Sequence, residues 1–269
     1  MYFSAGRTGF FTDTFLRKLF ASSWVLDTTD VFIIPDHITI TSVVAATDAF
    51  EVSVAKESRV GLHPLAVPPR RRVLVGAQNC YSDLLGPFTG EVSPAVLSEV
   101  GCSIVELGHA ERRRLFGETD ETTAAKADAV SRTGMIPLVC VGEVNGPAFS
   151  QMGSSEEQLS AAANEVMVQV RSVLSAVRDE SQIVLAYEPV WAIGASEPAP
   201  VEHVLGVVKR IRASPEVQNR TGEVRIVYGG SAGPGLFDNL KEELDGLFLG
   251  RFAHDPDQFL RTVLEVAKA

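Results

Sequence analysis

Glu188, at the end of an apolar run, is the residue of this sequence whose surroundings best suit proton transfer. Glu188 comes after residues 183–185, whose β-branched and apolar side chains are typical of a buried strand. Pro189 ends that strand because it has no backbone N–H, and an apolar loop then runs to Gly194. A carboxylate at a strand tip, beside a loop that can exclude water, suits a general base. The alternative is a solvated glutamate that opens a turn.

A histidine and two glycine-rich turns supply complementary groups. His109 follows a second apolar run, and a helix beginning at Ala110 would favour a neutral ring that donates a hydrogen bond to a carbonyl oxygen. The alternative is a histidine that caps a turn. The turns at 228–233 and 249–251 can present backbone N–H groups to an anion. Together these groups predict removal of a proton next to the carbonyl of a small phosphorylated sugar.

The elements that must position these groups form an alternating series. Short apolar runs predict eight strands, at residues 2–5, 31–35, 73–78, 103–107, 136–141, 183–186, 224–228 and 246–249. Helical patterns separate them, among them one from Thr12 and others over residues 41–46 and 236–244. This alternation predicts an α/β fold, a single (β/α)8 TIM barrel over residues 1–269, with an irregular insertion around residues 50–72. Residues after each strand then meet at one mouth, which favours the catalytic interpretation of Glu188.

Composition narrows the class of partner and the compartment. The net charge of −10 gives no basic surface for nucleic acid or an anionic membrane. Three cysteines in apolar surroundings indicate reduced thiols, as in a cytoplasmic protein. No apolar run approaches the ~18 residues of a membrane span, and the first residues lack the core of a signal peptide. A soluble cytoplasmic protein is expected.

Several segments, taken in order, carry a resemblance to a known family. They are residues 75–79 (VGAQN), 88–94 (FTGEVSP), 108–113 (GHAERR), 116–121 (FGETDE), 140–143 (CVGE), 186–194 (AYEPVWAIG) and 228–231 (YGGS). These segments resemble the signatures of triosephosphate isomerases. The resemblance implies a cytoplasmic homodimer without metal or cofactor that interconverts dihydroxyacetone phosphate and glyceraldehyde 3-phosphate. This family is itself the standard example of a neutral catalytic histidine and a closing lid.

The resemblance also assigns roles to individual residues. It makes Glu188 the base, His109 the neutral electrophile, and Glu111 an acid that orients the active-site cation. Residues 189–200 correspond to the lid. The phosphate grip corresponds to the backbone amides of Gly194, Ser231, Gly250 and Arg251. Thr89 lies in the loop that enters the neighbouring subunit of the family's dimer, and Gln78 belongs to the same dimer region.

Three segments depart from the family pattern. Arg7 stands where the family has a lysine that neutralises the substrate, and an arginine is not equivalent to an ammonium group. Arg251 replaces a glycine and either adds a cation at the phosphate or points away. The second half of the lid, residues 195–199, differs as well.

The Gly-Arg pair and residues 106–109 (ELGH) resemble a sister branch that isomerises erythrulose phosphates. Two alternatives therefore stay open. One is an isomerase of a four-carbon ketose phosphate, and the other is a barrel that has lost catalysis and serves in binding.

Overall fold

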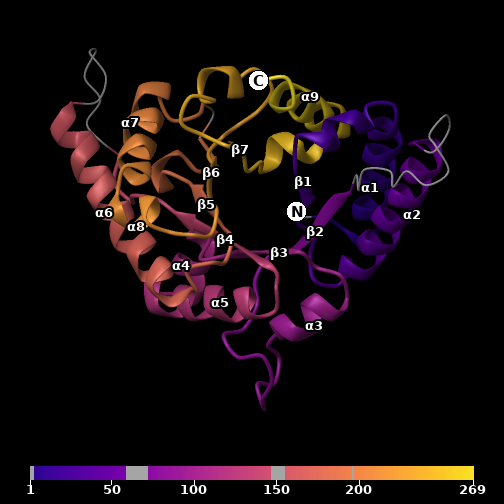
Figure 1. Cartoon of the computed structure of the whole chain (residues 1–269), viewed down its shortest axis with the longest axis horizontal. Coiled ribbons are helices and arrows are strands. Elements are labelled where there is room, and N and C mark those ends of the chain that lie inside the picture. Colours follow the sequence, from indigo (N-terminus) through magenta and orange to yellow (C-terminus); the bar gives the residue numbers. More distant parts are fainter. Residues whose placement is uncertain (1–2, 59–71, 147–154, 196) are drawn as a thin grey trace.

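The computed structural model describes residues 3–58, 72–146, 155–195 and 197–269. Its centre is a parallel sheet that curls around one axis (Figure 1). The strands are β1 (Val31–Ile33), β2 (Val73–Ala77), β3 (Ile104–Leu107), β4 (Ile136–Val141), β5 (Ile183–Tyr187), β6 (Val224–Tyr228) and β7 (Gly246–Leu247). Each strand pairs in parallel with the next one along the chain. The expected α/β class and TIM-barrel architecture are confirmed.

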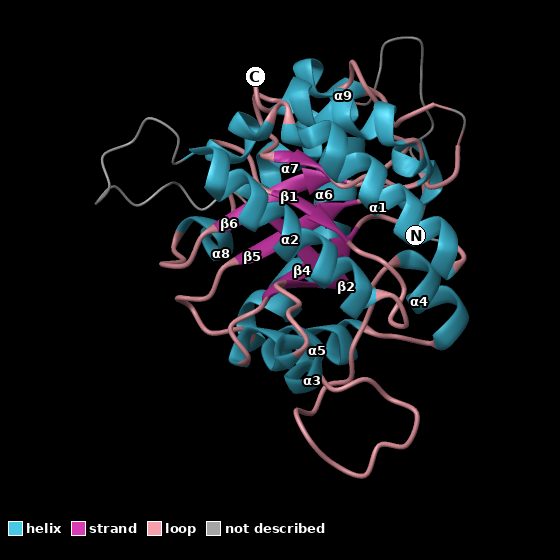
Figure 2. Ribbon diagram, turned by 90° about the vertical axis from the view of Figure 1, so that its right-hand side faces the viewer, coloured by secondary structure: helices cyan, strands magenta, loops and turns pink. Residues whose placement is uncertain are grey.

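Helices surround the sheet on its outer side (Figures 1 and 2). The α-helices are α1 (Ala5–Phe20), α2 (Ile40–Ser58), α3 (Pro94–Glu99), α4 (Ala110–Phe116), α5 (Asp120–Arg132), α6 (Glu156–Ala176), α7 (Val201–Arg212), α8 (Pro215–Gln218) and α9 (Pro256–Val266). Short 3-10 turns are η1 (Ser23–Asp27), η2 (Val190–Ala192), η3 (Phe237–Asn239) and η4 (Arg251–His254). No helix within the described ranges combines the length and hydropathy needed to cross a membrane.

Side chains alternate between two packing environments along each strand. On β3, Val105 and Leu107 belong to the cluster packed under the surrounding helices. Ile104 instead belongs to a smaller cluster with Leu138 of β4 and Ala186 of β5, on the inner face of the sheet. This is the alternation between inner and outer face that is expected of a barrel.

The predicted first strand at residues 2–5 is wrong. Ala5 begins α1, and the Ser4 hydroxyl caps this helix by accepting a hydrogen bond from the Arg7 N–H (3.3 Å). The helix extends this far because Phe11, Phe15 and Leu19 bury one continuous apolar face. Tyr2 lies outside the described residues.

Because the predicted first strand is not formed by the described residues, the sheet has a seam between β1 and β7. Among the described residues, β1 pairs only with β2, and β7 pairs only with β6. The other edges of β1 and β7 therefore face each other without a connecting strand (Figure 1).

Two other predicted segments need correction. Residues 50–58 are helical, because Phe50 and Val54 continue the buried face of α2 that begins at Val43. The rest of the expected insertion, except Arg72, lies outside the described residues. The helix expected over 236–244 is reduced to η3, where the Glu265 carboxylate accepts hydrogen bonds from the N–H groups of residues 235, 237 and 238.

Candidate active site

The proposed base lies at the carboxyl end of β5. The Glu188 N–H donates to the Val141 carbonyl (2.8 Å), which holds the backbone against β4. The carboxyl side chain is almost fully buried, and the Cys140 thiol donates a hydrogen bond to it. Burial raises the pKa of Glu188 to about 8, and the nearby Glu106 contributes to the increase. A carboxyl group with this pKa is suited to exchange protons near neutral pH.

A glycine provides the space that this carboxyl group occupies. A Cβ atom added at Gly229, just after β6, would lie 2.7 Å from Oε1 of Glu188 and closer still to its Cγ. No ordinary side chain fits there without moving the base. A glycine is therefore required at position 229, because the Glu188 side chain lies close to the backbone there.

The histidine is held in its neutral form with a defined tautomer. His109 is the N-cap of α4, and its Nδ1 accepts a hydrogen bond from the Glu111 N–H (3.2 Å). The ring proton is therefore on Nε2, which lies 3.9 Å from Oε2 of Glu188. Burial lowers the pKa of His109, although the Glu111 carboxylate 3.9 Å from Nδ1 acts in the opposite direction. The ring can thus donate from Nε2 to a substrate oxygen without being charged.

The expected phosphate loops meet the lid. Gly194 has a φ of +77°, a conformation that favours glycine, and its carbonyl accepts a hydrogen bond from the Arg251 guanidinium (3.2 Å). The Ser231 hydroxyl donates to the Ala195 carbonyl (2.8 Å). Loops after β5, β6 and β7 are therefore in contact at one side of the mouth.

One cavity connects these groups. It has a volume of about 1310 Å³. The expected site residues that line it are Gln78, His109, Glu111, Glu188, Gly194, Ser231, Gly250 and Arg251. Base, electrophile and phosphate loops, which are far apart in the sequence, thus border the same space. In the described parts of the chain, His, Cys, Asp and Glu side chains form no group of three or more that could hold a metal ion.

Arg7 and Thr89 are placed elsewhere. Arg7 is on α1 with its guanidinium 4.0 Å from the centre of the Phe3 ring, and it lines a second cavity of about 420 Å³. Arg251 borders both cavities. Thr89 is exposed on the loop between β2 and α3, which projects from the body of the molecule (Figures 1 and 2). The catalytic role of Arg7 stays a prediction.

A buried carboxylate anchors the segment that is expected to be the first hinge of the lid. Glu143, which is 1% exposed, receives hydrogen bonds at Oε1 from Trp191 Nε1 (2.9 Å) and from the Tyr187 hydroxyl (3.3 Å). His203 Nε2 on α7 lies 2.9 Å from the same oxygen. The Glu143 carbonyl also accepts from the Val190 N–H (3.0 Å). The segment that is expected to form the lid therefore starts from a fixed point.

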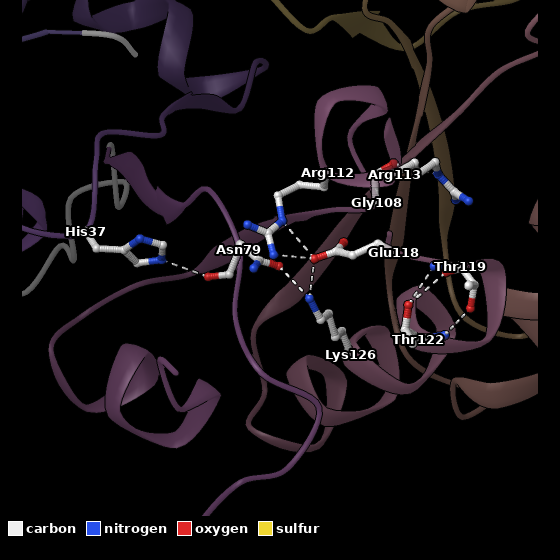
Figure 3. Close-up of polar contacts among 9 residues, drawn as sticks. All are labelled: His37, Asn79, Gly108, Arg112, Arg113, Glu118, Thr119, Thr122 and Lys126. Carbon is white, nitrogen blue, oxygen red and sulfur yellow. Dashed lines mark hydrogen bonds and ion pairs between the residues drawn. The ribbon is translucent and has the colours of Figure 1, made fainter. Parts of the chain in front are cut away.

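A charged network supports the loop that carries His109 (Figure 3). Glu118 accepts hydrogen bonds from Arg112 of α4 (2.8 Å) and from Lys126 of α5 (2.5 Å). Lys126 also donates to the Asn79 side chain (3.0 Å), whose backbone carbonyl is 2.9 Å from His37 Nε2. Burial opposes ionisation, but the bonds from Lys126 and Arg112 outweigh it and lower the pKa of Glu118. The network joins the segments that follow β1, β2 and β3.

Sequence reasoning gave no role to several residues around this site. Cys140 is expected to be a reduced thiol and lies in one of the segments that carry the family resemblance, but neither feature marks it as a partner of Glu188. His203 has no motif that marks it as a partner of Glu143. Glu106 had a signal, since it is the one charged residue in the apolar run Ile104–Leu107. A charged side chain inside such a strand indicates either an edge or a function.

A parallel barrel with a buried carboxyl group, a neutral histidine and glycine-rich loops at one mouth defines a class of enzyme, the isomerases of phosphorylated sugars. Comparison with known proteins agrees. The family model for triosephosphate isomerase matches residues 44–266. The chain therefore belongs to the triosephosphate isomerase family, and it is an enzyme of the aldose–ketose isomerase type.

Individual relatives fall into two groups. The chain is 48% identical to an L-erythrulose-1-phosphate isomerase of Pectobacterium atrosepticum over 188 residues, which are 70% of each chain. It is 37% identical to a triosephosphate isomerase of Synechocystis over 194 residues, 71% of this chain and 74% of that one. A second L-erythrulose-1-phosphate isomerase, from Rhizobium rhizogenes, is 40% identical over 72% of this chain and 73% of its own length.

Proposed function

We propose that the protein isomerises a three- or four-carbon ketose phosphate by moving a proton between adjacent carbons through an enediol(ate). The observation that carries this proposal is the pair formed by Glu188 and His109. A carboxyl oxygen and a neutral Nε2–H lie 3.9 Å apart in one cavity with the glycine-rich loops. Removal of a proton from a carbon next to a carbonyl group requires a base at that carbon and, at the same time, a hydrogen-bond donor at the carbonyl oxygen.

The proposed reaction balances with these two groups. The Glu188 carboxylate removes a proton from the carbon next to the carbonyl and becomes a carboxylic acid. His109 Nε2–H donates a hydrogen bond to the carbonyl oxygen while negative charge develops there. The acid then returns the proton to the neighbouring carbon, which restores the carboxylate. The proton of the original hydroxyl group moves to the former carbonyl oxygen, so that the new carbonyl group and the new hydroxyl group are both neutral.

The lid and its partner loops are proposed to bind the phosphate. The amides of Gly194, Ser231, Gly250 and Arg251 are the expected donors, and all four residues border the cavity. Because Arg251 now donates to the Gly194 carbonyl, phosphate binding would compete with that contact. Arg7 would reach the phosphate only from the neighbouring cavity that it shares with Arg251.

Two substrates are candidates. Dihydroxyacetone phosphate and glyceraldehyde 3-phosphate are expected from the signature sequences. L-Erythrulose 1-phosphate is favoured by the 48% identity to an isomerase of that compound. Measurement of kcat/KM for both substrates with the purified protein separates them. If neither substrate is converted above background at millimolar concentration, the proposed activity is wrong.

The remaining alternative is a barrel that binds a phosphorylated sugar without converting it. Phosphoglycolate, which resembles the enediolate, distinguishes this case. Tight binding that is lost in His109→Ala would support a working catalytic site. We further infer that residues 1–269 act as one domain in a cytoplasmic homodimer, with the projecting loop around Thr89 as the contact between subunits.

A further inference from the structure

Glu106 is a lumen-facing carboxyl group that the proposed mechanism does not use. It is on β3, where its neighbours Val105 and Leu107 pack under the helices. Its own side chain points to the opposite face, as Ile104 does, and borders the same cavity as His109 and Glu188. It lies three residues before His109 in the chain, and its charge is close enough to Glu188 to raise the pKa of that carboxyl group.

This carboxyl group lacks the partners that other internal acids have. Glu143 and Glu118 each accept several hydrogen bonds. Among the residues that the structure describes, Glu106 forms no hydrogen bond with another side chain. Burial raises its pKa to about 7. A half-buried carboxyl group that lines the cavity without a hydrogen-bond partner is available to a hydroxyl group of a ligand.

The position of Glu106 relative to the two ends of a substrate is defined by the barrel. The phosphate loops follow β5, β6 and β7, and β3 lies on the far side of the ring from β7 (Figure 1). A sugar phosphate held at Gly194 and Ser231 would pass between Glu188 and His109 and end on the β3 side. The group at that end, away from the phosphate, is the one that Glu106 can meet.

We propose that Glu106 determines substrate specificity by accepting a hydrogen bond from the terminal hydroxyl group of a four-carbon ketose phosphate. This inference rests on the proposed isomerase function and names its substrate class. In a three-carbon substrate, every carbon would be held by the phosphate loops, the base or the histidine. No group of that substrate would then reach Glu106, whose carboxyl group would stay without a hydrogen-bond partner. A fourth carbon with its hydroxyl group extends past the reacting carbons toward β3. Sites that hydrogen-bond a substrate hydroxyl reject the analogue lacking it far more strongly than apolar pockets do.

The experiment compares two substrates in matched variants. Glu106→Leu removes the acceptor, and Glu106→Gln keeps an acceptor oxygen of the same shape. We expect the ratio of kcat/KM for L-erythrulose 1-phosphate to that for dihydroxyacetone phosphate to fall at least ~100-fold in Glu106→Leu. Glu106→Gln should lie between this variant and the wild type. Glu111→Gln, a second acid at the cavity, should lower both values by a similar factor and leave the ratio unchanged.

Thermal melting separates this role from a structural one. Because Glu106 has no described partner, both variants should melt at or above the wild-type temperature when no ligand is present. A lower melting temperature together with an equal loss for both substrates would show a structural counter-ion and overturn the proposal. An unchanged ratio would overturn it as well.

Binding measurements keep this test independent of turnover. Calorimetry with erythritol 4-phosphate and glycerol 3-phosphate should show tighter binding of the four-carbon compound to the wild type. That preference should be lost in Glu106→Leu. If neither compound is isomerised but the preference is present, the proposed catalytic function fails while the role of Glu106 stands. Equal binding of both compounds by the wild type contradicts the role of Glu106 whatever the turnover.

Discussion

At the scale of single residues, the surroundings of Glu188 make its protonation state depend on the fold. Its pKa in the folded protein is about 8, well above the ordinary value of 4.5. The folded state therefore holds a proton between these values that the unfolded chain has lost. Since the unfolded chain binds fewer protons there, this group makes the protein less stable as the pH rises from about 4.5 to about 8.

Glu188→Gln should therefore change stability and activity in opposite directions. We expect kcat to fall at least ~100-fold because the base is lost. The melting temperature of the variant, relative to the wild type, should rise between pH 5 and pH 8. The wild-type kcat/KM should increase with pH. The pH at the midpoint of this increase should lie above the pKa of an ordinary glutamate. A relative melting temperature that does not change with pH would show that Glu188 is not buried as an acid.

Gly229→Ala tests whether the base needs the space beside it. The added methyl group would collide with the Glu188 carboxylate, so we expect kcat to fall about 10- to 100-fold. Gly246→Ala is the matched control, since a Cβ there meets only Val227 at an ordinary distance of 3.5 Å. Steady-state kinetics and a thermal melt of both variants suffice. Equal losses in the two variants would mean that general packing, and not the base, is disturbed.

At the scale of elements, the network around Glu118 fixes the loops that follow three strands. Its carboxylate is 6% exposed and Lys126 is 9% exposed, so that removal of one partner leaves a buried charge. We expect Glu118→Gln to lower the free energy of unfolding by about 3 kcal/mol at neutral pH. The loss should shrink as the pH falls, because the pKa of Glu118 is low and its contribution disappears on protonation.

An exposed ion pair provides the control for that prediction. Glu156 pairs with Arg210, but its side chain is 82% exposed. Glu156→Gln should change the free energy of unfolding by less than about 1 kcal/mol. Urea unfolding of both variants gives the comparison. Similar values for the two would show that the Glu118 network does not hold the loops.

Elements with a strong local pattern could be predicted from the sequence, and those decided by distant residues could not. The β-branched runs gave strands β2 to β6 almost to the residue. The end of α2 was missed although Phe50 and Val54 continue its apolar spacing. The segment at 236–244 could not be predicted, because Glu265 of α9 binds its backbone N–H groups. In the site, strand ends located Glu188 and His109, but the direction of Glu106 depends on which face of β3 is inside.

At the scale of the whole molecule, the projecting loop between β2 and α3 is the contact that the expected dimer would use. Thr89 is exposed on this loop, where the Tyr81 and Phe88 rings pack 4.4 Å apart. We expect Thr89→Arg to convert a dimer into monomers with much lower activity. Val168→Arg on the exposed side of α6 should leave the dimer intact. Sedimentation velocity measures both. A wild type that is monomeric at all concentrations would contradict the expected dimer.

The seam between β1 and β7 also divides the mouth of the barrel by local stability. Among the described residues, strands β3 to β5 pair on both edges, whereas β7 pairs only with β6. Amide hydrogen exchange should therefore be slowest where His109 and Glu188 are attached and fastest where Gly250 and Arg251 follow β7. The reacting groups would be attached to strands that open rarely, and the phosphate-binding groups to a strand that opens more often. Part of the free energy of phosphate binding would then order β7 and the loop that follows it. A bound phosphate should therefore slow amide hydrogen exchange in β7, at a distance from the reacting carbon.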